Sequence, residues 1–501
     1  SVTGNERKQK PISEQAEVLV VKVRSDIQMC VPNSVALLTP YVLLEQEDWF
    51  EDEIGFVRKL LKPGMHTIDI GASYGIYSLM MAKAVGPNGK VWSFEPTTSP
   101  AAFLEESIKQ NQYTNVVLSQ IGLSNREGAA KLKSSANSEL NTLTLDGNAG
   151  DDFELVKLST LDICRQENAW EIIDFVKMDA EGEESRIVEG GKRFFSEQSP
   201  LVLFELKHGD VLNMSLLQKF RDIGYATYRL VPGLNVLVPF DADQALDPYQ
   251  LNLFCCKPDR AEILEEQGLL AKGKSISTET SPTKALTWRD LLYRLPYAQN
   301  LLKAWEESSR HLPHDEAYHQ ALNHYAQAHT EKLPPALRYG YLEQSFVILS
   351  EIIEREGNIC RLQSLARVSW EIGKRKVALR VLGDLIARLD KEEATLTEPF
   401  LAVSRRFEWI GPGDSAEQWC MASALEQQEK LCAFSSYFTG KNSLHNLAMM
   451  KNLPFYGPEM ERRRQLIQLR YHMQHEPELH SVLASPAKNN LNSGFWVGKR
   501  I

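Results

Sequence analysis

Residues 67–86 read TIDIGASYGIYSLMMAKAVG, an apolar strand followed by a turn of small residues and a helix. Gly71 and Gly75 lack the Cβ atoms that would clash where backbone and ligand come close, and Ala72 and Ser73 keep the turn small. The helix begins near Gly75, and its N-terminus offers unpaired N–H groups and the positive end of its dipole. This pattern predicts a bend of the main chain against which a carboxylate-bearing ligand can lie.

A second acidic strand end lies 24 residues beyond Gly71, at Glu95 of the run VWSFE. There a carboxylate can accept hydrogen bonds from both hydroxyls of a ribose. A dinucleotide turn needs G-x-G-x-x-G to admit a pyrophosphate, whereas this chain has D-I-G-A-S-Y-G. Asp69 would repel a pyrophosphate and attract a cationic aminoacyl end. The spacing favours S-adenosylmethionine; a nicotinamide enzyme and a purely structural strand-to-helix turn are the alternatives.

Strand-like runs alternate with helical segments from about Val18 to Lys257, which is typical of an open α/β sheet. Nearly continuous apolar runs predict five parallel strands covered on both faces: HTIDI (66–70), VWSFE (91–95), VVLSQIG (116–122), IIDFVKMD (172–179) and LVLFE (201–205). YATYRLV, NVLV and LNLFCC predict an antiparallel edge, and AKLK and FELVKLSTLD predict an inserted hairpin. We therefore expect a Rossmann-like α/β fold with a mostly parallel seven-stranded sheet.

The 501 residues exceed what one hydrophobic core usually holds, so we expect two domains. The first covers residues 1–260 and includes an N-terminal extension; a linker covers 261–300, around KGKSISTETSPTKA; and an all-α domain covers 301–501. A 33-residue offset relates Gly340 to Gly373 and places small residues at Ser345 and Ala378. This part resembles a tetratricopeptide repeat, although a generic helical bundle fits as well, and the resemblance implies a protein partner or self-association.

The composition narrows the class of partner. Hydrophobic residues make up 43% of the chain and charged residues 24%, as in an ordinary globular protein, and the formal net charge is −10. A nucleic-acid partner is excluded on this basis, because phosphate binding rests on clustered Lys and Arg. No apolar run approaches the roughly 20 residues that span a bilayer, so we expect a cytoplasmic protein without a transmembrane segment.

Five segments in order resemble the FkbM-type methyltransferase family. They are LLKPGMHTIDIGASYGIYS, VWSFEPTTSPAAFLEESIKQN, LSTLDI with Asp162, IIDFVKMDAEGEESRIVEGG and PLVLFEL, which together lie within residues 45–210. Ser73 departs from the family, which usually has Asn there. The resemblance implies a class I methyltransferase fold and methyl transfer from S-adenosylmethionine to an oxygen, often of a sugar, glycan or polyketide, with S-adenosylhomocysteine as product.

Two sets of site residues follow from the turn, the strand ends and this resemblance. The predicted cofactor-binding residues are Asp69, Gly71, Ala72, Ser73, Tyr74, Gly75, Glu95, Pro96, Gly122 and Asp179. The predicted catalytic residues are Asp179, Glu181 and His208, because a base near the donor methyl would assist attack by a hydroxyl.

A bound metal ion is the alternative to a general base. A divalent ion held by Asp179, Glu181 and Glu205 could lower the pKa of an acceptor hydroxyl, but carboxylate clusters also serve substrate alone, so no metal is predicted.

A different class of function stays open beside the enzyme. In it the α/β half is a catalytically inactive methyltransferase and the helical half binds a protein partner. The departure at Ser73 and the repeat at Gly340 and Gly373 motivate this alternative. Cofactor binding separates the two hypotheses, because only the enzyme requires it.

Overall fold

The computed structural model describes residues 18–133, 143–144, 153–208, 211–273, 286–311, 316–473 and 495–496. Its contacts divide the chain into two compact units. The first comprises Ser1–Phe50, Val57–Ile223 and Gln465–Ile501, and the second comprises Glu51–Phe56 and Gly224–Arg464. The sequence-based domain limits differ from these units and remain a prediction.

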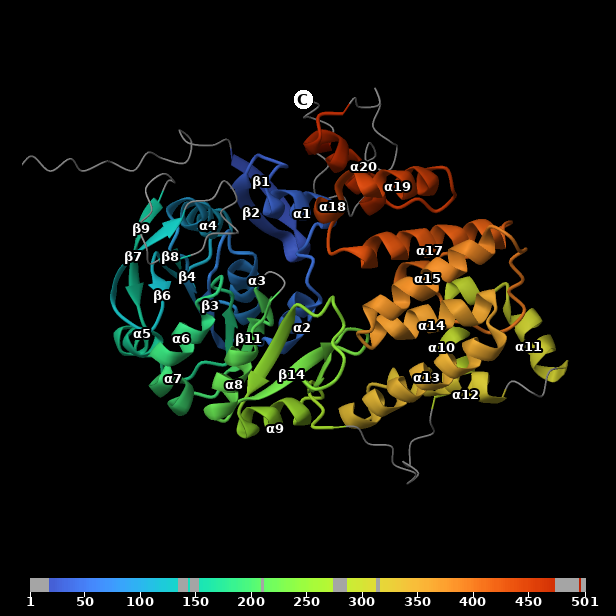
Figure 1. Cartoon of the computed structure of the whole chain (residues 1–501), viewed down its shortest axis with the longest axis horizontal. Helices are drawn as coiled ribbons and strands as arrows, with labels where there is room; N and C mark the ends of the chain where they lie inside the picture. Colours follow the sequence, from blue (N-terminus) through green and yellow to red (C-terminus); the bar gives the residue numbers. More distant parts are fainter. Residues whose placement is uncertain are drawn as a thin grey trace, which may run out of the picture. The chain divides into compact units, whose positions relative to one another are not determined.

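The first unit contains five parallel strands (Figure 1), of which four bury their apolar side chains and one, β5, buries them only partly. They are β3 (His66–Ile70), β4 (Lys90–Phe94), β5 (Val116–Ser119), β10 (Phe175–Met178) and β11 (Leu201–Glu205). The second unit contains β14 (Ala226–Val231), β15 (Val236–Pro239) and β16 (Asn252–Cys256), with β14 antiparallel to both neighbours. Strand pairing gives one sheet in the order β15-β14-β16-β11-β10-β3-β4-β5.

This order confirms the predicted Rossmann-like α/β fold of the class I methyltransferase type. The sheet has eight strands where seven were expected, because β15 pairs with β14 along Tyr228–Val231. From β3 the chain proceeds outward through β4 and β5, and it later returns to β10 on the opposite side of β3. Ligands of open α/β sheets bind at such a switch point, beyond the carboxyl ends of the strands. We therefore expect a ligand site at the carboxyl ends of β3 and β10.

Shorter strands accompany the main sheet. β7 (Gly128–Lys133) pairs antiparallel with β9 (Phe153–Ser159), as the predicted insertion requires, and residues 134–142 and 145–152 lie outside the described ranges. The remaining strands are β1 (Val18–Val23), β2 (Ile27–Pro32), β6 (Gly122–Leu123), β8 (Leu143–Thr144), β12 (Lys207–His208) and β13 (Val211–Leu212). The predicted third strand therefore ends at Ser119, and Gly122 belongs to β6 instead.

Helices flank the sheet and fill the C-terminal part of the chain. Those up to residue 222 are α1 (Leu38–Gln46), α2 (Asp52–Leu60), α3 (Ile76–Val85), α4 (Thr98–Gln110), α5 (Leu161–Asn168), α6 (Glu184–Gly190), α7 (Lys192–Glu197) and α8 (Met214–Asp222). The later ones are α9 (Pro258–Glu266), α10 (Trp288–Leu292), α11 (Leu302–His311), α12 (Glu316–Ala328), α13 (Pro335–Glu356), α14 (Ile359–Glu371), α15 (Arg375–Leu389), α16 (Arg405–Glu408), α17 (Ala416–Cys432), α18 (Ser436–Thr439), α19 (Leu444–Lys451) and α20 (Pro458–Arg470). Among the described residues, no helix combines the length and apolar character that crossing a bilayer requires.

The helices of the second unit share their core with the β14–β15 hairpin. Val231, Val236 and Val238 belong to the same buried cluster as Trp288 and Trp305. Ser345 of α13 and Ala378 of α15 are fully buried, and the Ser345 hydroxyl donates to the carbonyl of Ala321 in α12 at 2.8 Å. These small residues allow the close helix packing that the sequence indicated.

The predicted 33-residue repeat is not reproduced in the helix positions. Gly340 lies inside α13, whereas Gly373 follows α14 and has a φ of +91°. Two equivalent repeat positions would occupy the same point of their helical units. The tetratricopeptide resemblance of this part is therefore not confirmed.

Candidate functional site

The turn after β3 is held by hydrogen bonds to the neighbouring strand. The N–H groups of Gly71 and Ala72 both donate to the carbonyl of Phe94, at 2.9 and 3.0 Å. Gly71, Ser73 and Gly75 have φ values of +75°, +50° and +88°, the left-handed region that favours glycine. α3 begins at Ile76, as predicted, with Gly75 as its N-cap.

Packing within the chain explains why residues 71 and 75 are both glycine. A Cβ atom on Gly71 would lie 1.8 Å from the carbonyl oxygen of Asp179, and one on Gly75 would lie 2.2 Å from Cδ1 of Leu104. Gly71 therefore lets the turn of β3 pass directly over the backbone that leaves β10. The two strand ends at the switch point depend on each other for their positions.

Glu95 follows β4 and ties that strand end to the turn. Its Oε1 accepts from the N–H of Ser73 at 2.9 Å, and its Oε2 accepts from the N–H of Thr97 at 2.8 Å. The side chain is buried, which raises its pKa to about 7 even though these hydrogen bonds lower it. A carboxylate oxygen has two lone pairs. The Thr97 side chain is a third partner, and Glu95 still keeps accepting capacity for a ribose hydroxyl.

Asp69, the other predicted acidic strand end, is directed into the protein interior. Its side chain is 0% exposed, and Oδ2 accepts from the Ser78 hydroxyl of α3 at 2.6 Å. Burial raises the pKa of Asp69, while the ammonium of Lys177 and the Ser78 hydrogen bond act against that rise. In this structure Asp69 joins β3 to α3, and its assignment as a cofactor ligand remains a prediction.

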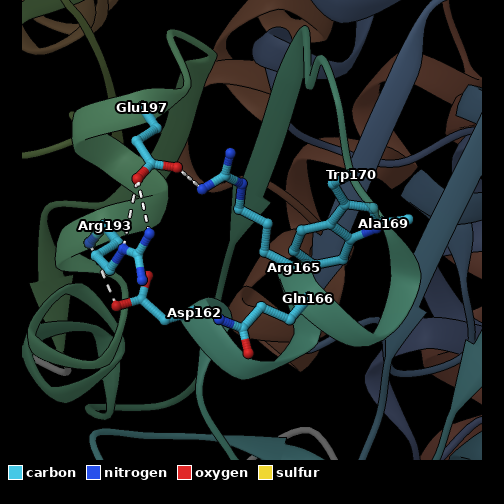
Figure 2. A pocket seen from close by; sticks show the side chains of 7 residues that line it. All are labelled: Asp162, Arg165, Gln166, Ala169, Trp170, Arg193 and Glu197. Carbon is cyan, nitrogen blue, oxygen red and sulfur yellow. Dashed lines mark hydrogen bonds and ion pairs between the residues drawn. The ribbon is translucent and has the colours of Figure 1, made fainter.

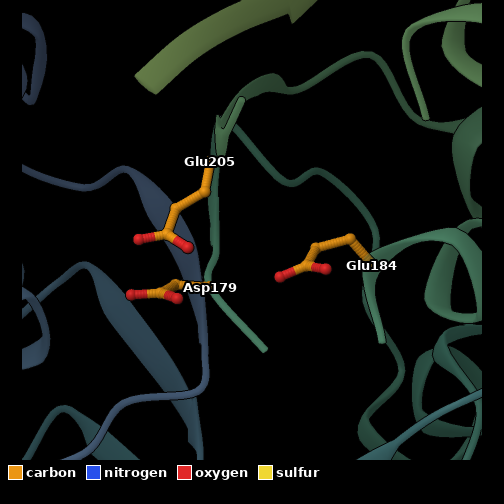
Figure 3. A group of neighbouring side chains, drawn as sticks. All are labelled: Asp179, Glu184 and Glu205. Carbon is orange, nitrogen blue, oxygen red and sulfur yellow. The ribbon is translucent and has the colours of Figure 1, made fainter. Parts of the chain in front are cut away.

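Asp179 lies directly after β10, and its N–H donates to the carbonyl of Ile70 at 3.0 Å. Its carboxylate forms a group with Glu184 and Glu205, in which one oxygen of each lies within 4.8 Å of the others (Figure 3). Glu205 ends β11 and Glu184 begins α6. Such a set of oxygens could contact a polyol or a hard cation.

The group of carboxylates in the structure differs from the predicted group in one residue. Glu181 has a φ of +47° in the turn before α6, and Glu184 takes its place beside Asp179 and Glu205. Glu184 is buried, and its Oε1 accepts from the N–H of Ala180 at 3.0 Å. Sequence reasoning missed it because spacing alone does not reveal that the chain reverses at residues 181 and 182. His208 lies in β12, and its side chain is outside the described residues.

The remaining predicted cofactor residues surround the same turn. Ala72 and Tyr74 are buried, and the Tyr74 ring packs edge-on against Phe103 with centroids 5.8 Å apart. A Cβ atom on Gly122 would lie 3.6 Å from Cβ of Pro96, so these two residues are neighbours. The fold thus brings together most of the set that the sequence proposed.

Asp162, which belongs to the third family-like segment, lies at a separate pocket between α5 and α7 (Figure 2). Its oxygens accept from the N–H groups of Phe194 and Arg193, at 2.7 and 3.3 Å. Arg165 and Arg193 both pair with Glu197. Asp162 thus joins α5 to the first N–H groups of α7, which is a structural contact.

Buried polar atoms without partners test whether the turn fits a polar ligand. Among the described residues, Ser73 Oγ and Asp179 Oδ1 are buried atoms that make no hydrogen bond, whereas Asp69 Oδ1 makes none but forms an ion pair with Lys177. Native proteins leave few such atoms, and those that remain call for an explanation. Two of them near one turn, beside Glu95, fit a nucleoside-type ligand with a polar tail.

The fold and this geometry give a candidate nucleotide-type site at the switch point of an α/β sheet. Residues 69–226 match the model of one family, the Methyltransferase FkbM domain. This segment contains the turn, Glu95 and Asp179, so the family resemblance of this part is confirmed. The chain thus carries a segment similar to an S-adenosylmethionine-dependent methyltransferase domain. No curated protein matches the chain significantly.

Solved structures show weak likeness. A methyltransferase FkbM from Methylobacillus flagellatus KT is 18% identical with a TM-score of 0.26, covering 38% of this chain and 43% of that chain. A SAM-dependent methyltransferase from Aquifex aeolicus is 13% identical with a TM-score of 0.25, covering 43% and 93%. A SAM-dependent O-methyltransferase from Thermotoga maritima is 14% identical with a TM-score of 0.24, covering 48% and 77%. The match spans less than half of the Methylobacillus chain, and scores this low carry no argument about activity.

Proposed function

We propose that this chain is an S-adenosylmethionine-dependent O-methyltransferase whose acceptor is a hydroxyl of a sugar, glycan or polyketide-type product. The observation that carries the proposal is Glu95, which Ser73 and Thr97 hold beside the glycine turn at the switch point. The match of residues 69–226 to the FkbM methyltransferase domain supports it and does not favour the inactive scaffold.

In this proposal the two strand ends divide the work. S-adenosylmethionine supplies an electrophilic methyl group and leaves as S-adenosylhomocysteine. Glu95 binds the ribose hydroxyls, and the N-terminus of α3 receives the carboxylate of the amino-acid end. Asp179 orients the acceptor hydroxyl and accepts its proton as the new carbon–oxygen bond forms, with Glu181 and His208 as the other predicted groups near this rim. Alignment of the acceptor oxygen at about 3 to 3.5 Å from the methyl carbon is the main requirement.

Cofactor binding is the first test. Isothermal titration of S-adenosylmethionine into about 0.1 mM protein is expected to give a dissociation constant between about 1 μM and 1 mM, the usual range for substrates. Absence of heat, confirmed by equilibrium dialysis with labelled cofactor, would overturn the proposal.

The position of methylation is the second test. S-adenosylmethionine labelled in its methyl carbon is incubated with panels of sugars, glycans and polyketide-type alcohols, and the products are read by NMR, which separates methyl on oxygen from methyl on nitrogen or carbon. Asp179→Asn is expected to lower turnover by about 10² to 10⁴-fold, the usual contribution of a positioned base, with a smaller effect on cofactor affinity. Products methylated only on nitrogen or carbon would contradict the oxygen assignment.

A further inference from the structure

Strand periodicity places a lysine between the two acidic strand ends. Alternate residues of a strand project from the same face of the sheet, so Lys177 of β10 and Asp179, two residues later, share a face. The parallel register pairs Lys177 with Asp69 of β3. Three charged side chains from two adjacent strands therefore meet on one side of the sheet.

The distances fit one ammonium shared by two carboxylates. Nζ of Lys177 lies 3.4 Å from Oδ2 of Asp179 and 3.9 Å from Oδ1 of Asp69. It also lies 4.9 Å from the ring centroid of Tyr77 in α3, a cation–π distance. Lys177 is 9% exposed, so these contacts occur largely out of water.

Because these charges are buried, their pairing affects stability strongly. A buried charge without a counter-charge is strongly unfavourable, and removal of one partner leaves the other uncompensated. Asp69 is fully buried, and Lys177 is the nearest cation to it for which the structure gives a contact. Asp179 keeps one oxygen on Lys177, while among the described residues its other oxygen makes no hydrogen bond. Lys177 therefore fixes one side of Asp179 and leaves the other side available.

We propose that Lys177 is a positioning residue of the cofactor and acceptor site: its ammonium holds the carboxylates of Asp69 and Asp179 in place, so that the group as a whole presents one surplus negative charge to a cationic sulfonium ligand. One positive and two negative charges leave that surplus. The inference rests on the proposed function for the identity of the ligand. The charge pairing itself does not depend on it.

A charge-conserving and a charge-removing variant test the binding role. Lys177→Met is expected to weaken S-adenosylmethionine binding about tenfold in isothermal titration, because Asp179 loses its fixed position. Lys177→Arg keeps the positive charge and is expected to stay within about threefold of the wild-type chain. The matched control is Lys192→Met at an exposed position of α7, and its affinity is expected to equal that of the wild-type chain. Equal affinities of Lys177→Met and Lys192→Met, or no rescue by arginine, would overturn the role in binding.

A double-variant cycle on the cofactor-free protein tests the charge pairing separately. Asp69→Asn, Lys177→Met and the double variant are compared by urea unfolding. If Lys177 compensates Asp69, the double variant is expected to be more stable than Lys177→Met alone, since it no longer buries an uncompensated carboxylate. Strictly additive losses would contradict the pairing. If the wild-type chain failed to bind S-adenosylmethionine, the proposed function would fall while this cycle still decided whether Lys177 compensates Asp69.

Discussion

Glu95 in the first unit and Glu371 in the second are both buried carboxylates, yet their pKa values move in opposite directions. Burial raises the pKa of Glu95 to about 7, and the groups that act against it are the N–H groups of Thr97 and Ser73. Burial also acts to raise the pKa of Glu371, but the charges of His329 and Arg367 outweigh it and hold the value at about 2. The two carboxylates thus differ in their partners rather than in their depth.

The network around Glu371 joins several helices of the bundle. Arg367 Nε donates to Glu371 at 2.8 Å, the Tyr325 hydroxyl donates to it at 2.5 Å, and His329 Nε2 lies 2.9 Å away. Arg367 also donates to Glu408 at 2.7 Å. Glu371 Oε1 and His329 Nε2 make no hydrogen bond but form an ion pair with each other. The charged groups of this cluster thus face opposite charges, which is the arrangement of a structural ion-pair network.

The comparison separates a structural polar cluster from a ligand site. At the glycine turn, the chain supplies backbone donors to Glu95 but leaves buried oxygens of Ser73 and Asp179 without hydrogen bonds among the described residues. Groups with perturbed pKa values and remaining hydrogen-bonding capacity are typical of functional sites. We therefore expect the cofactor site in the α/β part and a structural role for the charges of the bundle.

Removal of Arg367 is expected to have the largest effect on stability. Arg367→Met leaves Glu371 and Glu408 without their shared cation, and breaking a buried ion pair usually costs about 3 to 5 kcal/mol. Urea unfolding measures the loss, and Arg380→Met on the exposed side of α15 is the control. Binding of S-adenosylmethionine by the folded fraction should persist. A tenfold loss of affinity would break the proposed division between the two regions.

A methyl group at Gly71 is expected to affect stability and binding together. Gly71→Ala combines a left-handed φ of +75° with a Cβ atom 1.8 Å from the Asp179 carbonyl, so the turn and the end of β10 must separate. Gly64→Ala is the matched control, because its φ is +88° and nothing lies within 4 Å of its Cβ. The control isolates the backbone strain, about 1 kcal/mol, and the excess loss in Gly71→Ala measures the contact. Equal losses would show that the close approach does not matter.

Gly71 also illustrates what sequence can and cannot reveal. The turn, the start of α3 and the strands 66–70 and 201–205 were predicted correctly, because apolar runs and glycine spacing are local signals. From the sequence, Gly71 was expected to make room for a ligand, whereas in the structure it makes room for the backbone of Asp179, 108 positions away. Contacts between distant strands are set by topology, which local patterns do not contain.

Electrostatic partners were harder to predict than strand ends. Lys177 lies inside an apolar strand, where the pattern indicates only burial, and Glu184 needs the chain reversal at residues 181 and 182 to reach Asp179. Likewise, the antiparallel edge was predicted, but the core that β14 and β15 share with the helices could not be read from composition near a predicted domain border. The sequence proposed where the site lies, and tertiary structure determined which charges face one another.

Glu95→Gln is expected to weaken S-adenosylmethionine binding about tenfold and to lower stability by about 1 to 3 kcal/mol, because the N–H of Ser73 or Thr97 loses its acceptor. An amide offers one acceptor oxygen where the carboxylate uses two for Ser73 and Thr97, so the remaining capacity for ribose hydroxyls is lost. A lost hydrogen bond to a charged group is worth about 1.5 to 3 kcal/mol. The control is Glu105→Gln at an exposed position of α4, and the affinities are measured by isothermal titration. Wild-type affinity in Glu95→Gln would remove the central observation of the proposal.

A change of similar size, without loss of the site, is expected in the pH dependence of that same affinity in the wild-type chain. Glu95 has a pKa near 7 in the free protein against an ordinary 4.5, so the folded state holds this proton more tightly than the unfolded chain. The cofactor-free protein therefore loses this contribution to stability as pH rises from about 4.5 to about 7. Ribose binding requires the ionised form, so affinity changes in the opposite sense and is expected to be about tenfold weaker at pH 6 than at pH 8. Titration in buffers of different ionisation enthalpy should detect proton release near pH 6.5 in the wild-type chain and none from this position in Glu95→Gln.

An affinity that does not change over this range would show that Glu95 is already ionised. The contrast between Glu95 and Glu371 would then no longer support a functional role for Glu95.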